Sequence, residues 1–434
     1  MARILDFLEI SMKHITKVLG RFPFVGKYAV DVVTSSVFAG SAIMIIGANF
    51  ANFVAYIYHL VLGRLLGPQN YGELVSVISL FGILSVTFSS LGMVIIKFVS
   101  LATKDELEGF YFWIWKKALV FGLIVGGLIL LFAQHIAGFM HIDPVLVALI
   151  GPAFLFSVLA FTNRSFLQGM LNFKAHTLTI ISELTLRLVL GVVLVLAGLS
   201  VGGAVFGVFL STLLGYLVTR RYVQGFKKSG NREFNKLKEM AVFALPVFVS
   251  SVSTVSFFST DLILVKHFFE SSVAGEYAAL VNLGKIIFFG TGPISAVMFP
   301  LISKKMTQGK SYKKIFLISV FLTVALASGI LAVYLFFPEI AIVVLYGPKY
   351  LGRTHLLFWF GMVSMFFTLS GLFTSLYLSI NKTRMVLVML FGAIAQAIGI
   401  WYFHDTLESV LRVSLVVTFV TMTTLVMYFF KKKI

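Results

Sequence analysis

Long runs of apolar residues, separated by short polar connections, recur along the chain from about Val37 to Phe430. A helix needs roughly 20 predominantly apolar residues to cross about 30 Å of hydrocarbon. The pattern predicts an all-α polytopic membrane protein with twelve crossings, at approximately 37–63, 71–98, 110–133, 145–170, 176–198, 202–221, 240–268, 274–302, 315–337, 355–380, 385–403 and 407–430.

The residues before the first run have a different pattern. Between Ala2 and Gly20, apolar residues recur every three or four positions and charged residues occupy the opposite face. This periodicity predicts an amphipathic helix that lies in the membrane interface without crossing it. Together with a linker, the helix forms the predicted cytoplasmic segment 1–30.

Positive charge gives the predicted orientation. Most of the 35 Lys and Arg residues flank alternate connections, so the positive-inside rule predicts that both termini are cytoplasmic. The longest basic connection, 223–239, then divides the chain into an N-lobe at 31–222 and a C-lobe at 240–434, each with six crossings.

Short matching sequences relate the two halves. Gly72-Glu73 follows the first crossing and Gly275-Glu276 follows the seventh, while Ile136-Ala137 and Ile340-Ala341 follow the third and ninth. Because each half has an even number of crossings, we expect a pseudo-twofold axis along the membrane normal. Transporters built from repeats commonly bind substrate near the midplane, at the repeat interface.

Composition excludes several function classes. The chain is 59% hydrophobic and 12% charged, and its net charge of +18 is spread over loops, which indicates membrane orientation more than nucleic-acid binding. It contains no Cys. Gly309-Lys310-Ser311 lacks the earlier glycine of a phosphate-binding loop. We therefore expect no enzyme activity, metal site, nucleotide or cofactor, and transport driven by Na⁺, H⁺ or the substrate's own gradient.

Two cations fall deep inside predicted helices. Lys285 lies near the middle of the eighth crossing, where a charge costs at least ~2.5–3.5 kcal/mol. It would bind an anionic phosphate or pair with Asp261 or Glu276. Arg187 follows Glu183 by one turn, a spacing that favours an ion pair. The pair could brace the helices, or Arg187 could present its bidentate fork to a diphosphate.

The other candidates are weaker. Asp261, Glu183, Lys266 and Glu276 are candidates for ion coupling or gating, although salt bridges at the mouth of a cavity would use the same residues. Asn49 and Asn52 share one face of the first crossing and are candidates to bind a substrate headgroup. Buried amides in membranes more often join helices.

Several segments, in order, resemble the polysaccharide flippase family (Wzx-like, oligosaccharide translocase). They are LGRLLGPQNYGEL at 62–74, ELTLRL at 183–188, DLILVK at 261–266, FPLI at 299–302 and YGPKY at 346–350. The resemblance covers nearly the whole chain. It implies membership of the multidrug/oligosaccharidyl-lipid/polysaccharide exporter superfamily, whose members have two six-helix lobes in a V and alternate between inward-open and outward-open states.

The resemblance also implies a function. We expect a cell-membrane flippase that moves polyprenyl-(pyro)phosphate-linked oligosaccharide from the cytoplasmic to the outer leaflet. Its expected partners are this lipid-linked substrate, membrane lipids and the glycan polymerisation or glycosyltransfer machinery, with no nucleic acid. The alternatives are an ion-coupled multidrug or toxin exporter and a non-transporting scaffold or scramblase. Drug exporters of the superfamily often couple through an acid in the first helix, where this chain has Asn49 and Asn52.

Overall fold

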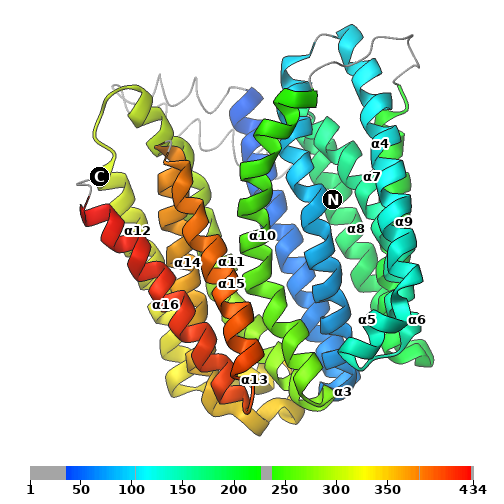
Figure 1. Cartoon of the computed structure of the whole chain (residues 1–434), viewed down its shortest axis with the longest axis vertical. Coiled ribbons are helices and arrows are strands. Elements are labelled where there is room, and N and C mark those ends of the chain that lie inside the picture. The colour runs from blue at the N-terminus through cyan, green and yellow to red at the C-terminus, as the bar shows by residue number, and fades with distance from the viewer. Residues whose placement is uncertain (1–35, 103, 226–236, 381, 432–434) are drawn as a thin grey trace, which may run out of the picture.

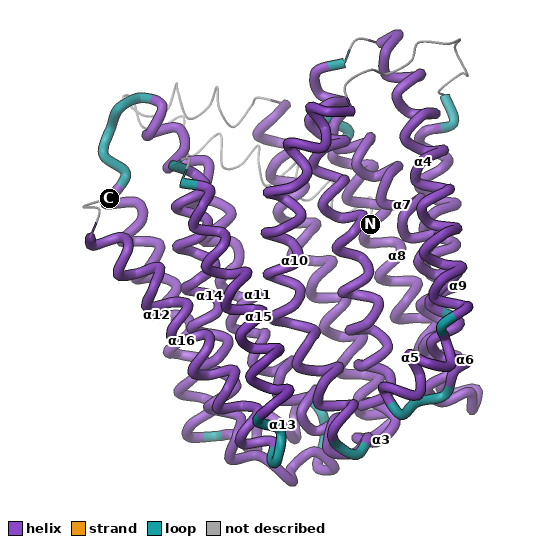
Figure 2. Tube along the Cα trace, viewed as in Figure 1, coloured by secondary structure: helices purple, strands orange, loops and turns teal. Residues whose placement is uncertain are grey.

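The structure is a computed structural model that describes residues 36–102, 104–225, 237–380 and 382–431. The predicted interfacial segment 1–30 and most of the predicted basic linker 223–239 lie outside these residues. Within the described ranges all regular structure is helical and there is no strand, as Figure 2 shows. The all-α prediction is confirmed for this part of the chain.

The helices follow the predicted apolar runs to within a few residues. The first group is α3 (Ser36–Leu101), α4 (Lys104–Leu131), α5 (Ala133–Met140), α6 (Pro144–Ala148), α7 (Ile150–Gly169), α8 (Phe173–Leu194) and α9 (Ser200–Val223). The second group is α10 (Leu237–Phe268), α11 (Ser271–Thr307), α12 (Lys313–Phe336), α13 (Pro338–Leu345), α14 (Leu357–Ser379), α15 (Val386–Tyr402) and α16 (Leu407–Lys431). The short helices α5 and α13 were not predicted, and α6 falls at the start of the predicted crossing 145–170.

The described residues contain ten apolar helical segments long enough to cross a membrane. Two of them fold back on themselves. The helix α3 reverses direction at Gly67 (φ 71°). The reversal is shown by Tyr71 Oη, which lies 3.2 Å from His59 Nδ1, whereas twelve residues of straight helix would separate the two residues by about 18 Å. The chain also reverses at Gly198 (φ 92°), since a Cβ on Gly207 would lie 2.9 Å from the backbone nitrogen of Gly191.

Figure 1 shows α3–α9 on one side of the molecule and α11–α16 on the other, with α10 and α11 packed against α3 between them. The two groups converge at the end that carries α5, α6 and α13, here called the α5/α13 end. They diverge toward the opposite end, where α16 terminates. We refer to α3–α9 as the N-terminal helices and to α10–α16 as the C-terminal helices.

Polar contacts join the two groups at the α5/α13 end. The hydroxyls of Tyr71 and Tyr346 are 3.3 Å apart, and Asn282 Nδ2 donates to Tyr71 Oη at 2.8 Å. Tyr350 Oη donates to the carbonyl of Gly63 at 2.7 Å. These side chains are buried in one hydrophobic cluster that contains residues of both groups, so this end is closed by a packed core.

Two glycines allow the closest backbone approach between the groups. A Cβ on Gly72 would lie 2.8 Å from the backbone nitrogen of Gly275, closer than side chains ordinarily allow. These are the glycines of the matching Gly72-Glu73 and Gly275-Glu276 sequences. The two matching sequences therefore lie against each other, one in each group of helices.

Cations at the ends of two crossing helices bind the carbonyls of short helices in the opposite group. The Arg64 guanidinium donates to the carbonyls of Leu345 at 3.0 Å, Val343 at 3.1 Å and Val344, at the end of α13. Lys266 Nζ donates to the carbonyls of Met140 at 2.9 Å and His141 at 3.0 Å, at the end of α5. A helix C-terminus has unsatisfied carbonyls and partial negative charge. We call these two contacts the reciprocal caps.

Candidate functional site

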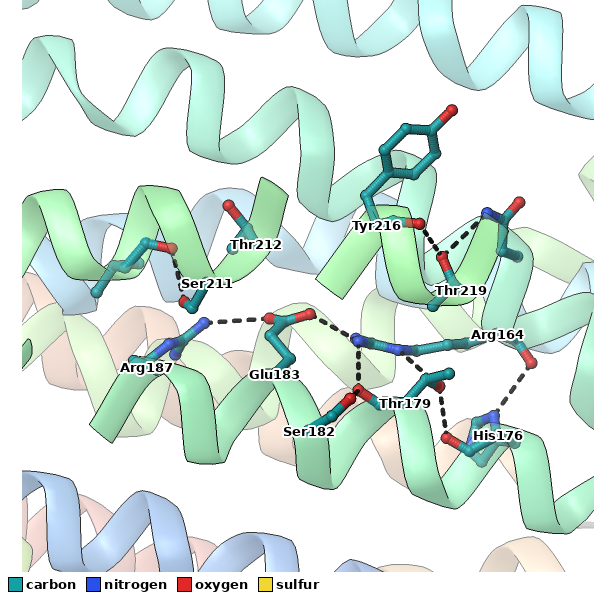
Figure 3. A network of polar contacts seen from close by, with 12 residues as sticks. Arg164, His176, Thr179, Ser182, Glu183, Arg187, Ser211, Thr212, Tyr216 and Thr219 are labelled. Carbon is teal, nitrogen blue, oxygen red and sulfur yellow. Dashed lines mark hydrogen bonds and ion pairs between the residues drawn. The ribbon is translucent and has the colours of Figure 1, made fainter. Parts of the chain in front are cut away.

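One polar site lies among the N-terminal helices and consists of Arg164, Glu183 and Arg187, here called the arginine cluster. Glu183 Oε2 accepts from Arg164 Nη2 at 2.7 Å, and Glu183 Oε1 accepts from Arg187 Nη2 at 3.3 Å. Figure 3 shows the two guanidinium groups approaching the carboxylate from opposite sides. The cluster therefore has two positive charges for one negative charge.

The neighbouring helices hold the arginine cluster in position. Arg164 comes from α7 and also donates to the hydroxyl of Thr179 at 3.3 Å and to its carbonyl at 3.0 Å, on α8. A Cβ on Gly215 of α9 would lie 2.6 Å from Glu183 Oε2. The glycine thus leaves the space that the carboxylate occupies, and three helices define the site.

Arg187 uses its guanidinium only in part. Its Nη2 binds Glu183, while its Nε is buried and has no hydrogen-bond partner. Its side chain is 18% exposed, against 11% for Arg164. Arg164 therefore has a structural role in holding α7 against α8, whereas Arg187 retains hydrogen-bonding capacity for a further group.

A second polar site lies among the C-terminal helices, at Asp261 and Lys285. Lys285 Nζ donates to the carbonyl of Phe258 at 3.2 Å and lies 5.1 Å from the centre of the Phe258 ring. Asp261 accepts from the Tyr277 hydroxyl at 3.0 Å and from the backbone nitrogen of Leu262 at 2.8 Å. Both side chains line a cavity of about 30 Å³. Among the ion pairs of the described residues, none contains either side chain.

Arg187 and Lys285, the two cations predicted deep inside helices, are both partly buried. Arg187 belongs to α8 among the N-terminal helices and Lys285 to α11 among the C-terminal helices, so each group contributes one of them.

The remaining predicted site residues have other surroundings. Glu276 Oε2 binds Arg353 Nη1 at 2.8 Å, a partner that the sequence analysis did not name. Lys266 belongs to the reciprocal caps and does not pair with Asp261. Asn49 and Asn52 are both exposed on the first arm of α3.

Sequence reasoning placed only two cations deep inside helices and missed the burial of Arg164 and Lys266. Arg164 is 9% exposed and Lys266 is 1% exposed. The only sequence signal at Arg164 is the polar run Thr162-Asn163-Arg164-Ser165, which interrupts a predicted crossing. Its ion-pair partner is 19 residues away on another helix.

The fold and its intramembrane cations define a multi-pass protein of the cell membrane with the architecture of a transporter. The polysaccharide biosynthesis protein family model matches residues 37–306, and the chain belongs to this family. An uncharacterized membrane protein of Methanocaldococcus jannaschii is 23% identical over 314 residues, which is 68% of this chain and 73% of that protein.

Two solved structures share the fold. The lipid II flippase MurJ in an inward closed conformation has a TM-score of 0.73 at 13% identity, covering 90% of this chain and 88% of MurJ. A multidrug resistance MATE family transporter of the MOP superfamily, in an inward-facing conformation, has a TM-score of 0.72 at 14% identity, covering 87% of this chain and 95% of the transporter. The chain therefore has the fold of MOP-superfamily transporters and flippases.

Proposed function

We propose that the chain crosses the membrane twelve times, as two six-helix lobes with both termini in the cytoplasm. The hairpins at Gly67 and Gly198 support this count, because each divides one of the ten apolar segments into two crossings. Basic residues at the ends of α9 and α16, Arg220, Arg221 and Lys431, support the orientation. The α5/α13 end then faces outward and is closed.

We further propose that the protein is a flippase for polyprenyl-(pyro)phosphate-linked saccharide. The observation that carries this proposal is Lys285, a cation inside the helices with a backbone carbonyl and an aromatic ring as its contacts and no carboxylate in ion-pair range among the described residues. An intramembrane charge with no carboxylate in direct contact is a candidate ligand site. A phosphate entering here would replace water with a charge-assisted hydrogen bond.

Arg187 is the proposed second phosphate contact. Its unpartnered Nε and its incomplete use by Glu183 leave donors for a diphosphate, and its planar fork suits two phosphate oxygens. Asn49 and Asn52 are both exposed on the part of α3 before Gly67, and they remain predicted contacts for the sugar headgroup. In this mechanism the polyprenyl chain stays in the bilayer while the headgroup passes between the lobes.

Alternating access would require the α5/α13 end to open. The reciprocal caps and the Tyr71–Tyr346 contact would have to separate, while the opposite end closes. Asp261 is the proposed coupling acid for H⁺ or Na⁺, because it is buried beside Lys285 and a change in its charge would act directly on that cation. Glu276, Glu183 and Lys266 are already held by other partners and would serve as structural or gating groups.

Flipping in proteoliposomes tests the proposal. We expect Lys285→Ala to abolish movement of a fluorescent polyprenyl-diphosphate saccharide, and Lys285→Arg to keep part of it. Lys117→Ala, which removes an exposed lysine of α4, is the matched control and should flip normally. Normal flipping by a well-folded Lys285→Ala protein would contradict the phosphate site.

An ion-coupled exporter of amphipathic molecules is the second candidate, and buried Asp261 favours it. The same vesicles separate the two functions. An exporter would move organic cations in a manner that depends on Asp261 and would leave the lipid-linked saccharide in place. The proposed flippase would move the lipid-linked saccharide and leave organic cations in place.

A further inference from the structure

A cavity of about 520 Å³ opens among the C-terminal helices, beside the Asp261–Lys285 site. Its volume is in the range of ~300–1,000 Å³ that is usual for small-molecule sites. Five helices, α10, α11, α12, α14 and α15, contribute to its wall. None of the residues predicted from the sequence lines it.

The wall of this cavity is uncharged and mostly apolar, and hydroxyl groups interrupt it. Eight of its 17 lining residues carry a hydroxyl, and none is acidic, basic or histidine. An ionic ligand would find no counter-charge there, whereas a neutral ligand with both apolar faces and hydroxyl groups would match both parts of the wall. The hydroxyl-bearing residues are Ser250, Thr254, Thr291, Ser295, Thr323, Thr368, Thr374 and Ser375.

Two of the hydroxyls have no hydrogen-bond partner in the described structure. Thr323 is 1% exposed and Thr368 is 9% exposed, and both hydroxyl oxygens are buried without a partner. A helical threonine ordinarily donates to a carbonyl one turn earlier, as Thr291 does to Ile287 at 2.7 Å. Buried hydroxyls in that state are rare and indicate a missing ligand or water.

The cavity therefore offers both hydrogen-bond donors and acceptors. Thr254, Thr291 and Thr374 donate to carbonyls of their own helices, so their oxygens remain acceptors. The hydroxyls of Thr323 and Thr368 have no partner where they stand, and rotation about χ1 would turn them into the cavity as donors. A saccharide hydroxyl both donates and accepts hydrogen bonds, so its binding site must supply an acceptor and a donor. The rings of Phe288, Phe299 and Phe367 also line the cavity and supply apolar faces for the C–H side of a sugar ring.

The position of the cavity relates it to the proposed phosphate site. Phe367 lines both this cavity and the small cavity that contains Lys285. Phe288 follows Lys285 by three residues, so both lie on the same face of α11. A phosphate at Lys285 and a group attached to that phosphate would thus occupy neighbouring spaces.

We propose that this cavity is a saccharide site that holds the first neutral sugar rings of the substrate while Lys285 holds the phosphate. This inference rests on the proposed flippase function and adds a sugar-binding element in the C-lobe. A free neutral saccharide has the same chemistry and could occupy the same cavity.

Isothermal titration on the full chain can test the site with three probes: farnesyl diphosphate, its glucosyl ester, and maltotriose. The detergent must contain no sugar, since a maltoside headgroup could fill the cavity; lauryldimethylamine oxide is suitable. The key variant is Thr323→Val/Thr368→Val, which keeps shape and removes both unpartnered hydroxyls. Thr162→Val is the matched control, because its buried hydroxyl donates to Val158 in α7, outside the cavity.

We expect wild-type protein to bind the glucosyl ester more tightly than farnesyl diphosphate. The double variant should lose this advantage, with a weakening of roughly 30-fold for two hydrogen bonds of ordinary strength. Its affinity for farnesyl diphosphate should not change, and its melting temperature should be equal or higher because the lost hydroxyls had no partners. The Thr162→Val protein should behave as wild type.

The outcomes separate the two proposals. Equal affinity for the two lipids in wild type, or a sugar advantage that survives in the double variant, would overturn the saccharide site and leave the phosphate site intact. If neither lipid binds but maltotriose does, and binding depends on the two threonines, the cavity is confirmed and the flippase proposal fails. Absence of binding by all three probes would overturn both.

Discussion

The two polar sites of this protein carry similar charges but are built differently. In the arginine cluster, one carboxylate binds two guanidinium groups at 2.7 and 3.3 Å, across α7 and α8. At the second site, Asp261 accepts hydrogen bonds from Tyr277 and Leu262. Lys285 donates to the carbonyl of Phe258 and lies over its ring. At the first site the opposite charges are in direct contact, with one positive charge in excess, whereas at the second site the two charges are not in contact.

This difference separates stability from ligand binding. Removing one member of a buried ion pair leaves an uncompensated charge and is costly. Lys285 is in no direct ion pair, and after its removal Asp261 still accepts hydrogen bonds from Tyr277 and Leu262. The arginine cluster should therefore dominate the stability of the N-terminal helices, and Lys285 should affect function with a smaller effect on folding. Variants at the two sites can test whether stability and ligand binding are separated in this way.

The largest effect is expected from Glu183→Leu. This change leaves both Arg164 and Arg187 without their carboxylate, so we expect a loss of ~3–5 kcal/mol in the free energy of unfolding, measured by thermal or denaturant unfolding in detergent. An unchanged melting temperature would show that the arginine cluster does not stabilise the fold.

The third member of the cluster determines how stability can be restored. Replacing only Glu183 and Arg187 by apolar residues leaves Arg164 buried alone, so stability should stay low. The triple variant Arg164→Met/Glu183→Leu/Arg187→Met should recover most of it. If the triple variant is stable and still flips lipid-linked saccharide, Arg187 has no role in substrate binding.

A steric change should perturb the same cluster without removing charge. Gly215→Ala places a Cβ 2.6 Å from Glu183 Oε2, and we expect a destabilisation of ~1–3 kcal/mol from the resulting displacement. Gly202→Ala on the same helix is the control, because nothing lies within 4 Å of its Cβ position. Equal melting temperatures for the two variants would contradict the packing of α9 against Glu183.

At the C-terminal site, Lys285→Met removes one carbonyl hydrogen bond, one ring contact and the positive charge beside buried Asp261, so we expect a loss of ~1–3 kcal/mol, smaller than that of Glu183→Leu. The same variant should not flip substrate. A loss of stability as large as that of Glu183→Leu would mean that Lys285 has a structural role, and the contrast between the two sites would disappear.

The smallest effect on stability is expected at the reciprocal caps. A cation at a helix C-terminus contributes typically ~0.3–1 kcal/mol, so Arg64→Ala/Lys266→Ala should change melting only slightly but favour opening of the α5/α13 end. The chain has no Cys, so spin labels at Val145→Cys and Ile340→Cys, both exposed there, report the separation specifically. A distance distribution unchanged from that of the labelled parent would show that the caps do not hold this end closed.

The sequence predicted the long helices well because each membrane crossing requires a long apolar run, and such runs are visible in the order of residues along the chain. It predicted the pair of Glu183 and Arg187 for a similar reason, since their contact lies within one helix. The partners of Arg164 and Lys266 are contributed by α8 and by the end of α5. Lys266 binds backbone carbonyls, which every residue carries, so no pattern of residue types could reveal that contact.

The cavity lined by Thr323 and Thr368 was missed for a different physical reason. Serine and threonine in membrane helices usually bind their own backbone, and the sequence does not distinguish those that do from those that do not. Only the packing of five helices brings these hydroxyls to one space and leaves two of them unpartnered.

The reciprocal caps have an evolutionary consequence if the two lobes arose by duplication. An ancestral six-helix chain that formed a parallel dimer would have made one cation-to-carbonyl contact twice, so every mutation would have altered both copies together. Fusion of the two copies ended that constraint. One contact now uses Arg64 and the other Lys266, which means that the two contacts can evolve different strengths.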